Sequence, residues 1–254
     1  MGAIADSFID EQANAKVAAY VHDKIHEIVQ DPATAKALCP TDHPIGTKRI
    51  CVDTDYYATY NRSNVRLVNL RETPIEKITA TGVQTSDEHI ELDALVLATG
   101  FDAMTGALLR MDIRGVDGVR LEDEWHAGPV TYLGLMVSGF PNLFTITGPG
   151  SPSVLSNMMV SIEQHVDFVC DCLQHMRDAQ KVTVEADATA QEHWVAHVNE
   201  VANATLFPKG GSWYLGANVE GKPQVFMPYA AGVGVYREVC EDVVANDYRG
   251  FQFA

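Results

Sequence analysis

Two adjacent cations end a turn-rich loop, and their types suit them to chemistry on an anion. The loop reads Thr41-Asp-His-Pro-Ile-Gly-Thr-Lys-Arg49. The Arg49 guanidinium stays charged and can donate several hydrogen bonds to a phosphate or an oxyanion. Lys48 offers a point charge for the same purpose. The residues alone equally allow a solvated basic pair on an exposed loop.

The charge of the whole chain bears on this pair. The 254 residues include 18 Lys and Arg against 34 Asp and Glu, a formal net charge of −16. A surface this acidic repels phosphate backbones and anionic lipid, so we expect neither a nucleic acid nor a membrane as partner. A phosphate-bearing ligand therefore needs a local basic site that opposes the general field.

A second candidate site is the run Gly148-Pro-Gly-Ser-Pro-Ser-Val-Leu-Ser-Asn-Met158, which leads into a helix. Ser153 or Ser156 is the expected N-cap residue. The free N–H groups and the positive dipole end of such a helix can stabilise a bound negative charge. An ordinary loop-to-helix cap is the alternative interpretation.

Three further candidates, Thr99, Gly100 and Asp102, follow the apolar run Ala94-Leu-Val-Leu-Ala98. This run is typical of a strand buried on both faces of a parallel sheet, where ligands bind at the carboxyl ends of strands. Asp102 could serve a ligand or cap the turn. No Gly-x-Gly-x-x-Gly fingerprint follows any predicted strand, so the sequence indicates a dinucleotide-binding fold without its opening βαβ unit.

Metal binding is not expected, because the histidine pairs His22/His26 and His193/His197 lack a third ligand at suitable spacing. We expect His165 to pack or to hydrogen-bond along a helix. The five cysteines are scattered and predicted to be reduced. We expect no secretory signal and no bilayer-spanning segment, and a cytoplasmic protein.

Hydrophobic periodicity predicts the elements that must position these residues. Helices are expected at about 9–29, 33–38, 188–205 and 238–246, with a long helix after residue 152. The apolar stripe predicted for the long helix comprises Leu155, Met158, Met159, Ile162, Val166, Val169 and Leu173. Strands are expected at 65–70, 75–80, 82–85, 89–93, 94–98 and 140–147.

Short motifs occur in a fixed order along the chain. They are Asp42-His-Pro-Ile-Gly-Thr-Lys-Arg49, Tyr56-Tyr57, Tyr60-Asn-Arg-x-Asn-Val65, Ala98-Thr-Gly-Phe-Asp-Ala103, Met111-Asp-Ile-Arg-Gly115, Gly148-Pro-Gly-Ser-Pro-Ser153, Ser161-Ile-Glu-Gln-His165, Thr205-Leu-Phe-Pro208, Ser212-Trp-Tyr-Leu-Gly-Ala-Asn218 and Gly221-Lys-Pro. This ordered set resembles class B flavoprotein monooxygenases, specifically the Baeyer–Villiger monooxygenases. The Gly-Ser-Pro-Ser form of the loop is similar to the phenylacetone and steroid monooxygenase branch.

The resemblance implies an α/β fold, namely the C-terminal part of a flavoprotein with two Rossmann-like dinucleotide-binding domains for FAD and NADPH. It implies that 1–72 ends the NADPH-binding domain, that 73–150 returns to the FAD-binding domain, and that 151–254 forms a C-terminal region of helices and loops. The implied activity is oxidation of a ketone to an ester or lactone with O2.

The resemblance also implies roles for individual residues. Arg49 is the implied catalytic residue, which donates hydrogen bonds to the negatively charged oxygen species and then to the oxyanion of the ketone adduct. Lys48 matches the lysine that contacts the 2′-phosphate of NADPH.

The implied cofactor contacts continue in the glycine-rich loops. Met158 would touch the flavin through its backbone, and Trp213 would pack near the nicotinamide, although a buried aromatic residue is nearly as good an interpretation. Thr99, Gly100 and Asp102 would adjoin the cofactor. Ser153, Val154 and Leu155 would line the substrate pocket.

The chain departs from the family in length, because family members are roughly twice as long and carry FAD and NADPH fingerprints that are absent here. One alternative is therefore an inactive stand-alone fragment, or an interaction module that needs a complementary N-terminal chain. Another alternative is a class B N-hydroxylating monooxygenase, which uses the same cofactors.

Overall fold

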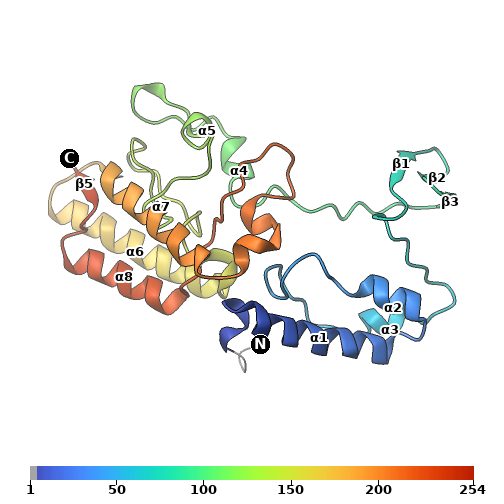
Figure 1. The fold of residues 1–254 in the computed structure, drawn as a ribbon. Coiled ribbons are helices and arrows are strands. Elements are labelled where there is room, and N and C mark those ends of the chain that lie inside the picture. The colour runs from blue at the N-terminus through green and yellow to red at the C-terminus, as the bar shows by residue number, and fades with distance from the viewer. Residues whose placement is uncertain (1–4) are drawn as a thin grey trace. The chain divides into compact units, whose positions relative to one another are not determined.

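The computed structural model describes residues 5–254, which divide into two units. Unit 1 consists of residues 5–7 and Glu11–Phe101, and unit 2 of Phe8–Asp10 and Asp102–Ala254. Figure 1 shows the elements of both units. None of the helices within residues 5–254 combines the length and the apolar character needed to cross a bilayer.

Unit 1 contains a helical cluster. Its elements are η1 (Ala5–Phe8, shared with unit 2), α1 (Glu11–Ile28), α2 (Pro32–Leu38) and α3 (Tyr56–Thr59). Ile25, Val29 and Ala35 form its buried core, against which Tyr57 and Tyr60 pack. The Asp31 carboxylate caps α2 by accepting a hydrogen bond from the backbone N–H of Thr34 (2.8 Å), and Pro32 occupies its first turn.

A small antiparallel sheet completes unit 1. Its strands are β1 (Ile75–Ile78), β2 (Gly82–Thr85) and β3 (His89–Glu91), in the order β1-β2-β3. The Thr85 hydroxyl accepts from the backbone N–H of Glu88 (3.1 Å) in the turn between β2 and β3. The predicted antiparallel ribbon is confirmed, as are the helices α1 and α2.

Two other strand predictions in unit 1 are wrong. Residues 65–70 form no strand. Ala94–Ala98 also lie outside every described strand, and the side chains of Leu95, Val96 and Leu97 are 45%, 86% and 68% exposed. The composition suits a buried strand, but the described residues supply no neighbouring strand and no helix to cover it.

Unit 2 is built around three long helices that run side by side (Figure 1): α6 (Met158–Asp178), α7 (Ala188–Asn203) and α8 (Val233–Ala245). They share one core with residues 132–136 and with a two-stranded sheet, formed by β4 (Val184–Ala186) and β5 (Phe251–Phe253). The other elements are α4 (Gly106–Leu109), η2 (Val116–Gly118), α5 (Leu121–Glu124), η3 (Ser153–Leu155), η4 (Phe207–Gly210) and η5 (Trp213–Leu215).

The long helix forms as predicted, but its buried face differs from the prediction. The buried side chains of α6 are Ser161, Gln164, His165, Phe168, Cys172 and Met176. Three members of the predicted stripe, Met159, Val166 and Leu173, are instead 63%, 44% and 48% exposed. α6 thus carries apolar residues on two faces, and unit 2 covers only one of them.

Three smaller predictions for unit 2 also fail. Residues 140–147 contribute only an isolated bridge between Met136 and Phe144. The N-cap of α6 is Asn157 and not Ser153 or Ser156. α8 begins at Val233, five residues before the expected start. α7 is confirmed, with Trp194 and Val198 buried.

Candidate cofactor and substrate site

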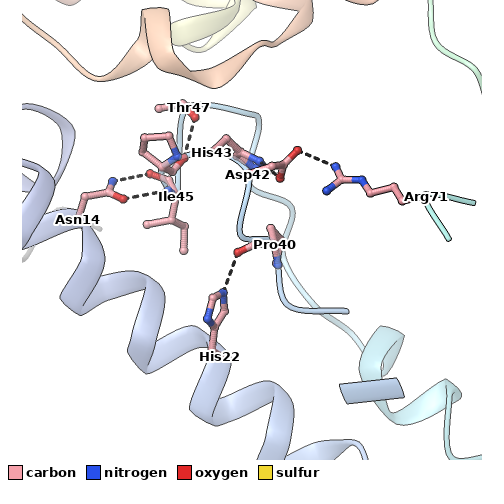
Figure 2. A network of polar contacts seen from close by, with 9 residues as sticks. Asn14, His22, Pro40, Asp42, His43, Ile45, Thr47 and Arg71 are labelled. Atoms are coloured by element: carbon pink, nitrogen blue, oxygen red, sulfur yellow. Dashed lines mark hydrogen bonds and ion pairs between the residues drawn. The ribbon is translucent and has the colours of Figure 1, made fainter. Parts of the chain in front are cut away.

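The loop before Lys48 is attached to α1 by a buried asparagine (Figure 2). The Asn14 side chain is 4% exposed. Its Oδ1 accepts from the backbone N–H of Ile45 (3.0 Å), and its Nδ2 donates to the carbonyls of Ile45 (2.9 Å) and Ser7 (2.8 Å). The two hydrogen bonds to Ile45 fix the loop more firmly than an apolar contact would, because moving the loop would leave buried polar groups without partners. Sequence reasoning missed Asn14, which has no neighbouring motif.

Further polar contacts hold the same loop (Figure 2). Asp42 accepts from Arg71 Nη2 (2.6 Å) and lies 2.7 Å from His43 Nδ1. These two partners hold the pKa of Asp42 well below its usual range, with Arg71 the larger cause. His22 Nε2 lies 3.0 Å from the carbonyl oxygen of Pro40. Within the loop, the Thr47 hydroxyl donates to the carbonyl of Pro44 (2.6 Å).

The two cations follow directly after this fixed stretch. Lys48 is half-buried and Arg49 is exposed. The predicted residues Thr99 and Gly100 also lie in unit 1, after the exposed run Ala94–Ala98. The other predicted site residues, from Asp102 onward, belong to unit 2.

In unit 2 the turn 148–151 is held by groups that are distant in sequence. Gly150 donates its N–H to the carbonyl of Met227 (2.7 Å) and accepts from Trp194 Nε1 (3.1 Å). The Thr131 hydroxyl donates to the carbonyl of Pro149 (2.6 Å). Glycine is required at position 148, because a Cβ there would lie 2.5 Å from the carbonyl oxygen of Gly134. This turn is therefore rigid within unit 2.

The residues predicted to line the substrate pocket follow the turn in η3. Ser153 is buried and adopts a positive φ of 43°, and its hydroxyl donates to Met104 Sδ (3.6 Å). Val154 and Leu155 pack on one apolar cluster with Trp213, around the buried Tyr214, Leu215 and Phe226. The structure thus brings three predicted residues, Val154, Leu155 and Trp213, into one cluster.

Asp102 is engaged by a lysine from the loop that carries Trp213. Lys222 Nζ donates to Asp102 Oδ1 (2.5 Å) and to the carbonyl of Ala103 (3.0 Å), and its side chain is 11% exposed. A Cβ on Gly216 would lie 3.0 Å from Cδ of Lys222, so glycine there leaves room for the lysine stem. Lys222 belongs to the Gly221-Lys-Pro motif, but the sequence alone predicts no role for it.

Met158 is the first residue of α6. The Asn157 side chain accepts from the N–H of Met159 (3.1 Å), which leaves other first-turn N–H groups of α6 without an intrahelical acceptor. Residues 5–254 contain no group of three or more histidine, cysteine or acidic side chains arranged to hold a metal ion. All five cysteines are free thiols.

The known proteins that the chain resembles in sequence include several monooxygenases. No protein-family model matches the chain. It is 40% identical over 253 residues to the acetone monooxygenase (methyl acetate-forming) of Gordonia sp. (strain TY-5). The aligned region covers 99% of this chain and 48% of that protein. It is 40% identical over 252 residues to a phenazine N-monooxygenase of Lysobacter antibioticus, with 98% of this chain and 46% of that protein covered.

A solved structure supports the same relationship. The structure of an oxidised steroid monooxygenase bound to NADP superimposes with a TM-score of 0.91 at 47% identity, over 98% of this chain and 47% of that chain. The chain thus spans about half the length of the relatives that it matches, and the matched part is their C-terminal half. Structural neighbours of this kind are two-domain FAD and NADP flavoproteins, which confirms the predicted fold class. By sequence and by fold, the chain therefore matches the C-terminal half of Baeyer–Villiger monooxygenases.

Proposed function

We propose that this chain is the C-terminal portion of an FAD- and NADPH-dependent Baeyer–Villiger monooxygenase that oxidises a ketone to an ester or lactone with O2. The observation that carries the proposal is the match over 99% of the chain to an acetone monooxygenase whose name specifies methyl acetate as product. The ordered motifs of the sequence, with Arg49 and the turn at 148–153 among them, support the same reaction.

The residues present fit one part of each cofactor. The first turn of α6, from Met158, offers free N–H groups and a positive dipole end, which suit the edge of a reduced flavin that becomes negative. Lys48, directly after a fixed loop in a chain of net charge −16, suits the 2′-phosphate of NADPH. No binding site for the diphosphate of FAD is predicted, because the 254 residues contain no Gly-x-Gly-x-x-Gly fingerprint after a predicted strand.

Bound FAD, once reduced by NADPH, would supply the oxygen-activating chemistry. The part of this chain is electrostatic. The Arg49 guanidinium keeps its charge and donates hydrogen bonds to negatively charged oxygen, which an ammonium group would do with less directional control. Ser153, Val154 and Leu155, on the rigid segment after Gly150, would set the shape of the ketone pocket.

We further propose that the 254-residue chain alone is inactive and that a complementary N-terminal half completes it. Two unpaired apolar surfaces support this. Ala94–Ala98 has the composition of a buried strand yet is exposed, and the apolar stripe Met159, Val166 and Leu173 on α6 is also exposed. Exposed apolar surface of this kind marks a protein interface.

A fusion tests the proposal. The first half of the matched steroid monooxygenase is joined to this chain, and ester formation from a ketone is measured with NADPH and O2. We expect ester product from the fusion and none from the 254-residue chain.

In the same fusion, Arg49→Ala should lower kcat about 10²–10³-fold, since it removes a donor to a developing oxyanion. Arg177→Ala, which removes an exposed arginine near the end of α6, is the matched control. A fusion that binds FAD and consumes NADPH without forming ester would refute the proposal.

One observation supports a second candidate, a class B N-hydroxylating monooxygenase. The chain is as similar to a phenazine N-monooxygenase, at 40% identity, as to the acetone monooxygenase. The same fusion, offered an aromatic nitrogen heterocycle instead of a ketone, separates the two candidates. An N-oxide as the only product would favour the second.

A further inference from the structure

Thr147, directly before the turn at 148–153, has an unusual backbone. Its φ is 54°, in the left-handed region that a β-branched residue rarely adopts. Such a conformation persists only where the surroundings impose it. The N–H of Thr147 donates to Nδ1 of His165 over 2.9 Å. This hydrogen bond links the residue before Gly148 to the N-terminal part of α6, the helix that follows residues 148–153.

The hydrogen bond fixes the tautomer of His165. A backbone N–H can only donate, so Nδ1 must be the acceptor and the ring proton must lie on Nε2. His165 is fully buried, and Nε2 has no protein acceptor among residues 5–254. The ring instead packs edge-on against Tyr236 of α8, with centroids 5.5 Å apart. The Tyr236 hydroxyl is occupied, since it donates to the carbonyl of Leu133 (2.6 Å).

The surroundings keep this imidazole neutral. Burial lowers the pKa of His165 to about 4, and no charged group opposes the shift. The titratable groups of α8 on this side are Tyr236 and Cys240. Burial raises the pKa of Tyr236 well above its usual value and that of Cys240 to about 11, so both are uncharged at neutral pH. On α6 itself, Glu163 and Asp167 are exposed.

We propose that His165 is a positioning residue: as the Nε2–H tautomer it holds the main chain at Thr147 and thereby sets the entry to the turn that carries Ser153, Val154 and Leu155. Other hydrogen bonds hold the turn at Pro149, Gly150 and Ser151, and come from Thr131, Trp194, Met227 and Tyr229. The hydrogen bond from Thr147 to His165 holds the chain at the residue directly before Gly148. That the turn lines a substrate pocket rests on the proposed function, but the tether itself does not.

The variants His165→Asn and His165→Gln form a matched pair. Both replace the ring by a neutral amide, but only asparagine places an oxygen one atom beyond Cγ, where Nδ1 stands; glutamine places it one atom further. His165→Phe keeps the ring volume and has no acceptor. Hydrogen exchange of the Thr147 amide in the 254-residue chain, measured by NMR, reports the tether without cofactor or substrate.

We expect Thr147 exchange in His165→Asn to stay close to that of the unchanged chain. Exchange should be about tenfold faster or more in His165→Gln and His165→Phe, the factor that corresponds to one hydrogen bond. In the unchanged chain, ¹⁵N shifts should show the proton on Nε2.

A proton on Nδ1, or equal exchange in all three variants, would overturn the proposal. The tautomer measurement needs no variant, so it decides the matter even if His165→Phe fails to fold. Neither readout depends on monooxygenase activity, so failure here is separable from failure of the proposed function.

Discussion

Two apolar runs of similar composition have opposite surroundings. Leu133, Leu135, Met136 and Val137 in unit 2 are all 0% exposed. In Ala94–Ala98 of unit 1, by contrast, Val96 is 86% and Leu97 68% exposed. In the first run, Leu133, Leu135 and Met136 share a core with α6, α7 and α8, and Val137 packs in a second cluster of the same unit. The second run has no such cover among the described residues.

The contrast shows that burial depends on available partners and not on composition alone. The hydrophobic effect rewards removal of apolar area from water, whichever element covers it. Unit 2 contains its own cover and therefore fixes the turn 148–153 from several sides. Unit 1 fixes the loop before Lys48 through Asn14 but leaves Ala94–Ala98 exposed, as expected if its neighbouring strands correspond to the part of the relatives that this chain does not match.

The largest expected effect is a cavity in the enclosed run. Leu135→Ala should lower the free energy of unfolding by about 2–5 kcal/mol, because it removes fully buried methyl groups. Leu97→Ala, the matched change in the exposed run, should cost less than about 0.5 kcal/mol. Urea unfolding of both variants checks the pair. Equal costs would mean that the two runs are equally enclosed.

Acid should weaken unit 2 through His165. Its pKa is about 4 in the folded chain, below the unfolded value of about 6.5, so the unfolded state binds the proton more readily. Stability that is fully present above pH 6.5 should therefore fall by about 3 kcal/mol as the pH drops toward 4. Unfolding measured at several pH values, with His165→Asn as reference, isolates this contribution. A pH dependence shared by both proteins would exclude His165 as its source.

The ion pair between Lys222 and Asp102 should matter more than an exposed one. Lys222→Met leaves the Asp102 carboxylate without its partner and should cost about 1–3 kcal/mol. Lys24→Met breaks the exposed pair with Glu27 on α1 and should cost less, because water screens an exposed ion pair. Urea unfolding measures both variants. A larger loss of unfolding free energy for Lys24→Met would contradict the burial of the pair between Lys222 and Asp102.

The smallest effect is expected at the surface contact of unit 1. Arg71→Ala removes the partner of Asp42, and the Arg71 side chain is 71% exposed. The cost should be at most about 1 kcal/mol and should vanish in high salt, because exposed charges are screened. Asn14→Ala should release the loop far more, seen as faster exchange of the Ile45 amide. If Arg71→Ala released Ile45 more than Asn14→Ala did, the surface pair would be the main anchor.

Local patterns predicted much of the secondary structure. The ribbon β1–β3 and the helices α1 and α7 follow from periodicity and turn residues that act within a few positions. The predictions of strands at 94–98 and 140–147 were wrong. A strand forms only beside a neighbouring strand, and the hydrophobic pattern of one segment carries no information about its neighbours. α6 was predicted as a long helix, but its buried face was not predicted, since both of its faces are apolar and the tertiary partners decide between them.

The site was only partly accessible to sequence reasoning. Val154, Leu155 and Trp213 were named in advance and lie in one cluster. Asn14, His165 and Lys222 received no positioning role, because each acts through a main-chain or side-chain partner that the fold, not the spacing, brings near. The roles expected for all the predicted site residues, Lys48 and Arg49 included, and the division at residues 72 and 150 stay predictions.

Flavin content tests the central claim most directly, that this chain supplies one half of a flavin monooxygenase. The 254-residue chain and its fusion to the first half of the steroid monooxygenase are purified in parallel, and bound FAD is measured by absorbance after gel filtration. We predict no retained FAD in the chain alone and one FAD for each molecule of the fusion. A full complement of FAD in the chain alone, or none in the folded fusion, would contradict the claim.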